Sequence, residues 1–395
     1  MGTNNAAEKR RPPFECIALL LQGGGALGAY QAGVYQALFE AGVEPDWVAG
    51  ISIGAINAAI IAGNPPDMRV GKLREFWEYI TEYKLPFYPA AFQSLMTRND
   101  TEHQMLNSFS AIHTVMSGIP GFFKPRFLSP WIQPRGSIAS ASYYDIAPFR
   151  ATLERLIDFD RLNTSGIRFN IGAVHVKKGN FTNFDNRTCM IGPEHIMASG
   201  ALPPGFPPVE IDGEYYWDGG LISNTPLQWM VDNESYLDML VFQVDLWSAD
   251  GEFPQNMADV MTRLKDIQYS SRTRANTDRF KDKHKLCHAI ANLLDRLPAE
   301  MKDLPEAKQL AAYADRKVYN IVHLIYHNKS YEGYSKDIEF SRLSMEAHWQ
   351  CGYDDTLHAL KHPQVLQRPD NPEGIAIFDF TKERKAREQK ASRQA

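Results

Sequence analysis

Ser52 has the neighbours of a serine nucleophile. It lies in the sequence GISIG, residues 50–54, between a short apolar run and an Ala/Ile-rich stretch with helical character. A G-x-S-x-G sequence between a strand and a helix is typical of a nucleophile elbow, where only glycines fit beside the serine. The hydroxyl would then lie at a helix N-terminus, which favours a negative oxygen. Because a serine at its normal pKa is a weak nucleophile, this site needs an adjacent base.

Asp218 is the candidate base. It follows the apolar stretch 214–217 and precedes two glycines, which allow the backbone to come close to a site. Asp212 is also followed by glycine, but the alternation over 209–217 predicts a hairpin in which Asp212 occupies the tight turn. An aspartate in a turn commonly accepts hydrogen bonds from its own backbone. On spacing alone, this structural role stays open for Asp218 too.

A glycine-rich turn, GGGALG at residues 23–28, precedes the serine by one strand–turn–helix unit. It matches the dinucleotide-binding pattern G-x-G-x-x-G. That function needs an acidic residue at the end of the next strand, whereas Glu44 and Asp46 come before the apolar run 47–51. A phosphate-binding P-loop is excluded because no Gly-Lys-Ser/Thr follows. What remains is a run of backbone N–H groups suited to an anion, which indicates an oxyanion hole.

These three motifs in this order resemble the patatin-like phospholipases, most strongly over residues 17–63 and 190–228. The family's site is a Ser–Asp dyad. Many members carry Arg or Lys inside the first glycine motif, where this chain has Ala26 and Leu27, so that charge is missing here. The resemblance implies catalytic Ser52 and Asp218, oxyanion-hole residues Gly23, Gly24 and Gly25, and motif glycines Gly28, Gly50, Gly54, Gly219 and Gly220.

The resemblance also implies a three-layer α/β/α fold with a mainly parallel central sheet, and a site at the C-terminal edge of its strands. The segment 331–342 is similar to a C-terminal extension found in a bacterial subgroup of the family. We therefore expect a polar tail over 1–15, a catalytic domain over 16–228, an extension packed on the core over 229–380, and a basic tail over 381–395.

Residues 84–140 are rich in proline, phenylalanine and serine and show little regular period, so an irregular insertion is expected. An aromatic loop packed on the core is one interpretation. The other is a lid or a lipid-facing surface, because aromatic and basic side chains together suit a membrane interface. Elsewhere the patterns predict helices over 69–83, 147–161, 193–201 and 257–317, a hairpin joining 167–176 to 181–184, and strands over 240–246 and 319–327.

A histidine-based triad is the nearest alternative mechanism. His175 and His195 are its candidates, although a single histidine is more often packed or solvated. His323 and His327 have the spacing of metal ligands on a helix, but their context is a strand, where residues four apart are about 13 Å apart. We therefore expect no metal and no cofactor.

Composition restricts the partners and the compartment. The formal net charge of −5 gives no reason to expect a nucleic-acid partner. The four cysteines lack metal-like spacing and are expected to be reduced thiols. The N-terminus lacks an apolar signal core, and no long apolar run predicts a membrane span. We expect a cytoplasmic protein that meets membranes peripherally, and the sequence does not predict its oligomeric state.

The resemblance implies a lipid acyl hydrolase of the phospholipase A or lysophospholipase type, acting on phospholipid or lysophospholipid through an acyl-enzyme. Two alternatives stay open. The same acyl-enzyme could pass its acyl group to an alcohol or thiol, which would make the protein an acyltransferase. A non-catalytic lipid-binding or scaffold protein is the other.

Overall fold

The computed structural model describes residues 11–82, 99–132, 138–227, 237–381 and 383, without the side chains of residues 139 and 271–276. Most of the two expected tails lies outside the described residues. So do residues 84–98 and 133–137 of the aromatic insertion.

In the described parts of the chain, nine strands form one sheet in the order β11-β10-β9-β1-β2-β5-β8-β7, with β6 on the other edge of β5. The six strands from β11 to β2 and β5 pair in parallel, whereas β6, β7 and β8 pair antiparallel. The strands are β1 Cys16–Leu21, β2 Trp47–Gly50, β5 Arg168–His175, β6 Phe181–Asp185, β7 Val209–Ile211, β8 Glu214–Asp218, β9 Met239–Asp245, β10 Tyr319–Ile325 and β11 Ile375–Asp379.

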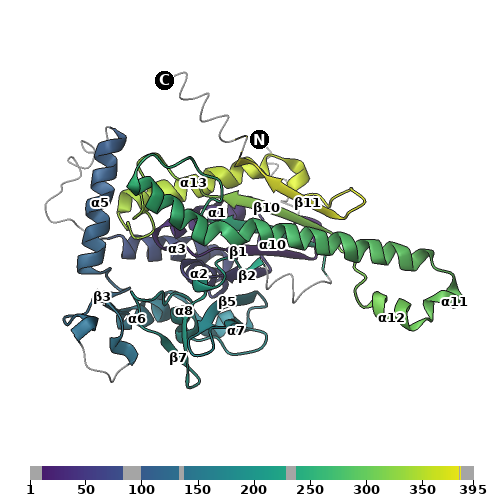
Figure 1. Cartoon of the computed structure of the whole chain (residues 1–395), viewed down its shortest axis with the longest axis horizontal. Helices are drawn as coiled ribbons and strands as arrows, with labels where there is room; N and C mark the ends of the chain where they lie inside the picture. The colour runs from purple at the N-terminus through teal and green to yellow at the C-terminus, as the bar shows by residue number, and fades with distance from the viewer. Residues whose placement is uncertain (1–10, 83–98, 133–137, 228–236, 382, 384–395) are drawn as a thin grey trace, which may run out of the picture.

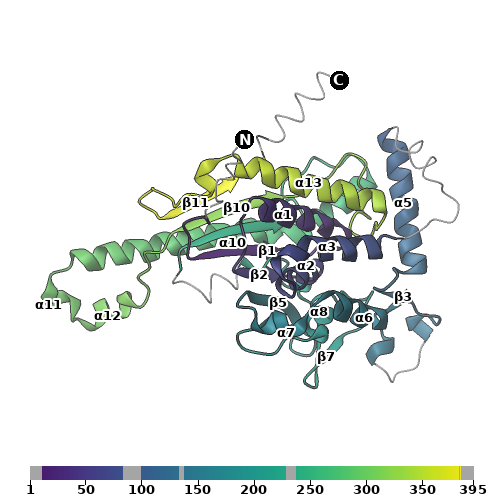
Figure 2. The same ribbon diagram turned by 180° about the vertical axis from the view of Figure 1, so that it is seen from behind.

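Helices cover both faces of this sheet. Helix α10 lies in front of the strands in Figure 1, and the reverse view in Figure 2 shows α1, α2, α3 and α13 on the opposite face. The implied three-layer α/β/α fold with a mainly parallel sheet is thus confirmed. The helices are α1 Ala29–Glu40, α2 Ile53–Ala62, α3 Pro66–Ile80, α5 Asp100–Ser117, α6 Ala147–Leu156, α7 Phe159–Thr164, α8 Pro193–Ser199, α10 Met257–Arg296, α11 Ala299–Lys302, α12 Pro305–Ala311 and α13 Arg342–Leu360.

The core follows from strand alternation. Because successive side chains of a strand point to opposite faces, β1 supplies both sides of the sheet. Leu19 packs in a buried cluster with side chains of α1, α2 and α13, while Leu20 packs in a second cluster that includes Phe280 of α10. All six residues of β1 are buried. This pattern explains why the strand is a continuous apolar run in the sequence.

The C-terminal part of the chain completes the same sheet. β9 pairs with every residue of β1, and β10 and β11 extend the sheet beyond β9. Helix α13 packs closely on α1: a Cβ added to Gly352 would lie 2.0 Å from the carbonyl oxygen of Tyr30. Residues before and after the candidate site are therefore parts of one core.

Two local predictions need correction. Residues 100–117, within the segment expected to be irregular, form the 18-residue helix α5, which begins after an Asn99 cap. Residues 147–161 are not one helix. The chain is extended at Ile157, and the Asp158 side chain accepts a hydrogen bond from the N–H of Arg161 to begin α7. The predicted 167–184 hairpin, the 193–201 helix and the 240–246 and 319–327 strands are confirmed to within two residues.

Candidate active site

Ser52 lies in a strained elbow between β2 and α2. Its backbone has φ 54° and ψ −123°, a left-handed φ that few non-glycine residues adopt. A Cβ on Gly50 would lie 2.3 Å from the carbonyl of Gly54, and a Cβ on Gly54 would lie 2.3 Å from the oxygen of Leu21. Both flanking glycines are therefore sterically required, as the motif predicts.

Asp218 reaches Ser52 because two strands meet end to end on one edge of β5. β2 pairs with the first half of β5, up to Ile171, and β8 pairs with its second half from Ala173 onwards. β8 runs antiparallel, so the C-terminal ends of β2 and β8 point toward each other across Gly172. Ser52 follows one of these ends and Asp218 is the other.

Ser199 holds the junction between these strands together. Its hydroxyl donates a hydrogen bond to the oxygen of Gly172 at 2.7 Å and accepts one from the Ser52 N–H at 3.1 Å. The two bonds connect α8 to β5 and to the elbow. Ser199 is fully buried, so water cannot easily replace its hydroxyl. Loss of this hydroxyl would therefore leave the Gly172 oxygen without its donor.

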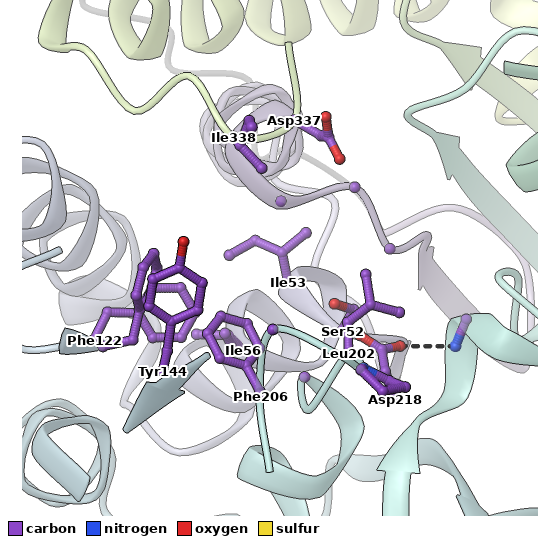
Figure 3. A pocket seen from close by; sticks show the side chains of 18 of the residues that line it. Ser52, Ile53, Ile56, Phe122, Tyr144, Leu202, Phe206, Asp218, Asp337 and Ile338 are labelled. Atoms are coloured by element: carbon purple, nitrogen blue, oxygen red, sulfur yellow. Dashed lines mark hydrogen bonds between the residues drawn. The ribbon is translucent and has the colours of Figure 1, made fainter. Parts of the chain in front are cut away.

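The carboxyl group of Asp218 is buried next to the serine. Its side chain is 2% exposed, and Oδ1 accepts a hydrogen bond from the Gly220 N–H at 2.7 Å. Figure 3 shows Ser52 and Asp218 side by side, with this bond dashed. Burial raises the pKa of Asp218 to about 7, against the smaller lowering effects of the Gly220 N–H and a Ser52 side-chain hydrogen bond. A pKa near 7 suits a general base.

The first glycine turn lies next to the serine. A Cβ on Gly23 would be 3.1 Å from the Ser52 Cβ. The Gly23 oxygen accepts hydrogen bonds from Trp247 Nε1 at 2.8 Å and from Asn224 Nδ2 at 3.0 Å. Because C=O and N–H point in opposite directions across a trans peptide, these two bonds also fix the direction of the Gly24 N–H.

The three glycines differ in how free their N–H groups are. The Gly23 N–H donates a long hydrogen bond, 3.4 Å, to the oxygen of Asn224. The N–H groups of Gly24 and Gly25 donate to no other residue of the described chain. Both residues line the cavity in front of Ser52. These two groups are therefore the donors most available to an oxyanion.

The segment 331–342 supports this turn from outside. The oxygen of Asp337 accepts a hydrogen bond from the Ala26 N–H at 2.8 Å, and a Cβ on Gly25 would lie 2.1 Å from that oxygen. The Lys336 ammonium group is buried, 2.5 Å from Asp266 Oδ1 and 4.7 Å from the centre of the Trp247 ring. Segment 331–342 thus contacts both the glycine turn and Trp247, whose indole donates to that turn.

An apolar cavity of about 280 Å³ opens in front of the serine. Its walls combine aromatic side chains with a few aliphatic ones, and Phe122, Phe123, Tyr144 and Phe206 pack together there with ring centres 4.7 to 6.2 Å apart. Figure 3 shows Phe122, Tyr144 and Phe206 of this group near Ile53 and Ile56 of α2. Part of the aromatic insertion therefore packs on the core, as one of its two interpretations predicts.

No histidine is among the described residues that line this cavity. His175 is 3.3 Å from Glu214, and His195 packs against Phe184 with its pKa lowered by burial. His323 and His327 line a separate cavity of about 190 Å³. The geometry thus favours Asp218 as the base.

One group of described side chains could hold a metal ion. Potential ligand atoms of His358, His362 and Glu383 lie within 4.8 Å of one another. None of the three lines the cavity in front of Ser52. Chemistry at the serine therefore does not involve this group directly.

Three positioning residues have no local signal in the sequence: Ser199, Asn224 and Trp247. Trp247 follows β9, and only the pairing of β9 with β1 brings it to the glycine turn. Trp247 could have been identified as a site residue only by predicting that β9 lies next to β1 in the sheet. Asp212, in contrast, lies where the hairpin pattern predicts, in the turn between β7 and β8 with φ 50°.

None of the helices in the described parts of the chain combines the length and the hydropathy that a bilayer span requires.

Comparisons with known proteins point to one family. The family model described as a patatin-like phospholipase matches residues 19–230, and a second model, described as a patatin phospholipase, matches residues 267–372. Lysophospholipase NTE1 of Saccharomyces cerevisiae is 25% identical over 254 residues, which are 62% of this chain and 12% of that protein. The putative patatin-like phospholipase domain-containing protein M110.7 of Caenorhabditis elegans is 41% identical over 61 residues, 15% of this chain and 6% of that protein.

This chain thus spans only a small part of the length of these curated relatives. Among solved structures, VipD from Legionella pneumophila superimposes with a TM-score of 0.40 at 16% sequence identity. That match covers 93% of this chain and 72% of the other.

Proposed function

Because the chain belongs to the patatin-like phospholipase family, we propose that it hydrolyses carboxylic esters of lipids through Ser52 and Asp218. One observation carries this proposal: a serine in a strained elbow lies beside a buried carboxyl group whose pKa is raised to about 7. The serine opens onto an apolar cavity, which suits an acyl chain.

The reaction has two halves. Asp218 accepts the hydroxyl proton as Ser52 Oγ attacks the ester carbonyl, and the resulting oxyanion accepts hydrogen bonds from the Gly24 and Gly25 N–H groups. Collapse of this intermediate transfers the proton to the leaving alcohol and leaves an acyl-serine. Asp218 then takes a proton from water, the resulting hydroxide attacks the acyl-serine, and fatty acid leaves as Ser52 regains its proton.

The proposed substrates are phospholipid and lysophospholipid. The name of the yeast relative, a lysophospholipase, supports this class, and so does the aromatic and aliphatic lining of the cavity. Transfer of the acyl group to an added alcohol uses the same acyl-enzyme. The assay below therefore includes such an acceptor.

The test is fatty-acid release from lysophosphatidylcholine and from phosphatidylcholine vesicles, with and without added glycerol as acceptor. Wild type is compared with Ser52→Ala and Asp218→Asn, and circular dichroism verifies that each is folded. Asp212→Asn is the matched control, because Asn tolerates the positive φ at that turn. Wild type and the control should release fatty acid, and both site variants should fall to background. A wild type that is inert on every ester, or full activity of Asp218→Asn, would refute the proposal.

A further inference from the structure

Helix α5 exposes an apolar stripe. At 3.6 residues per turn, Met105, Phe109, Ile112 and Met116 fall within about 60° of one another, and each is between 51% and 72% exposed. The buried face of the same helix carries Leu106 and Ala111, together with the polar residues Asn107, Ser110 and Thr114. A surface helix of a globular protein normally turns its apolar stripe to the core. We call these four exposed residues the α5 stripe.

A second group of exposed apolar side chains lies near the C-terminal end of α5. It occupies the loop after the short strand β3, Lys124–Pro125, and includes Phe127, Leu128, Trp131 and Ile132. α5 and β3 lie at the same end of the molecule in both views (Figures 1 and 2). Trp131 is 83% exposed and its Nε1 donates a hydrogen bond to the Tyr143 hydroxyl at 2.8 Å. We call these four residues the aromatic loop.

Both groups adjoin the cavity in front of Ser52. Val115, next to the last residue of the stripe, lines the cavity and is itself 43% exposed. Its oxygen accepts a hydrogen bond from the Tyr144 hydroxyl at 2.9 Å, which connects α5 to the cavity's aromatic wall. Tyr144 also belongs to β4, Tyr144–Asp145, the strand paired with β3. Val115 and Tyr144, which line the cavity, thus lie next to the two exposed groups, which do not themselves line it.

We propose that the α5 stripe and the aromatic loop together dock the protein on a phospholipid surface, so that a lipid enters the cavity without crossing water. This proposal rests on the proposed function, which makes a membrane lipid the substrate. A bilayer is favoured as the occupant because the surface borders the entrance that its lipids must use. An exposed tryptophan and tyrosine joined by a hydrogen bond also suit the interface between headgroups and acyl chains.

The charges indicate which lipids would bind. α5 begins with Asp100 and Glu102 and carries no lysine or arginine. At the base of the aromatic loop, Lys124 is paired with Asp145, and Arg126 donates a hydrogen bond to the Ser142 hydroxyl at 3.2 Å. Attraction to anionic lipid is therefore weak, and insertion of apolar side chains must supply the affinity. Binding to phosphatidylcholine vesicles should be strong enough to measure and should change little between low and high salt.

The test separates docking from catalysis. Binding is measured by co-sedimentation with phosphatidylcholine vesicles in the Ser52→Ala background, which leaves the vesicles intact. Phe109→Ser combined with Ile112→Ser removes the centre of the stripe. Because moving one such side chain out of water changes an equilibrium by about tenfold, the pair should weaken binding by about 100-fold. The matched control is Leu286→Ser with Leu293→Ser, which are 62% and 54% exposed on α10.

With Ser52 intact, hydrolysis of a water-soluble short-chain ester measures the site alone. The Phe109/Ile112 variant should keep this rate within about twofold and lose hydrolysis of vesicle phospholipid in parallel with binding. Equal vesicle binding by the stripe variant and its background, or equal losses in the α10 control, overturns the proposal. The proposal is also overturned if analytical ultracentrifugation shows a dimer that depends on the stripe, and dissociating this dimer leaves vesicle binding unchanged. Failure of wild type on the soluble ester would instead refute the proposed hydrolase, and the vesicle-binding result would stand.

Discussion

Replacing Asp218 by asparagine should abolish activity and make the protein more stable at alkaline pH. Asparagine has the same shape, and its oxygen can still accept the Gly220 N–H. It carries no charge, so it avoids the cost of keeping an ionised carboxylate in a buried site. The prediction expresses a conflict between function and stability at a single residue.

The magnitude follows from the pKa. Burial raises it from an ordinary 3.8 to about 7, and each pKa unit is about 1.36 kcal/mol of differential stability. Since the pKa is raised in the folded protein, the unfolded chain ionises first as pH rises. Wild-type stability therefore falls between about pH 4 and pH 7 and levels off above that. The cost is about 4 kcal/mol well above pH 7 and about 2 kcal/mol at pH 5.

Thermal unfolding of both proteins at pH 5 and pH 8.5 measures this difference. An unfolding entropy of about 2.1 cal/mol/K per residue gives about 0.8 kcal/mol/K for a chain of 395 residues. Asp218→Asn should therefore gain about 5 °C over wild type at pH 8.5 and about 2 °C at pH 5. A stability difference that is the same at both pH values, or a less stable variant at pH 8.5, would show that Asp218 does not titrate with a raised pKa.

Three further outcomes are expected. In the proposed mechanism Asp218 must be ionised to accept the serine proton. The kcat/KM on a soluble ester should therefore rise with pH and be half-maximal near pH 7. A flat profile from pH 5 to 9 would contradict this. Trp247→Phe removes a hydrogen-bond donor to the Gly23 oxygen and should lower kcat about tenfold or more with little change in KM. An unchanged kcat would mean that the glycine turn does not need this hydrogen bond. Gly352→Ala places a Cβ 2.0 Å from a backbone oxygen of α1 and should lower the free energy of unfolding, measured by chemical denaturation, by about 3 kcal/mol. The control Gly71→Ala has open space on α3 and should not destabilise the protein.

Local patterns predicted the parts of the site whose causes are local. The elbow at Ser52 depends on two flanking glycines, and the hairpin before Asp218 depends on alternation and an Asp-Gly turn, so both can be read within a few residues. Helix α5 was missed for a physical reason. Its apolar stripe faces outward and three of its five buried residues are polar, so the usual relation between period and burial does not hold there.

By itself, the sequence determined the chemical groups: a serine that must turn sharply, an aspartate before paired glycines, and a turn rich in free N–H groups. Tertiary structure alone decided how they meet. Ser52 and Asp218 are neighbours because β2 and β8 share one edge of β5, and the pKa of Asp218 is raised because the assembled core excludes water from it. Likewise, Trp247 orients the glycine turn only once β9 pairs with β1. Burial and orientation arise from contacts between distant segments, which local spacing does not encode.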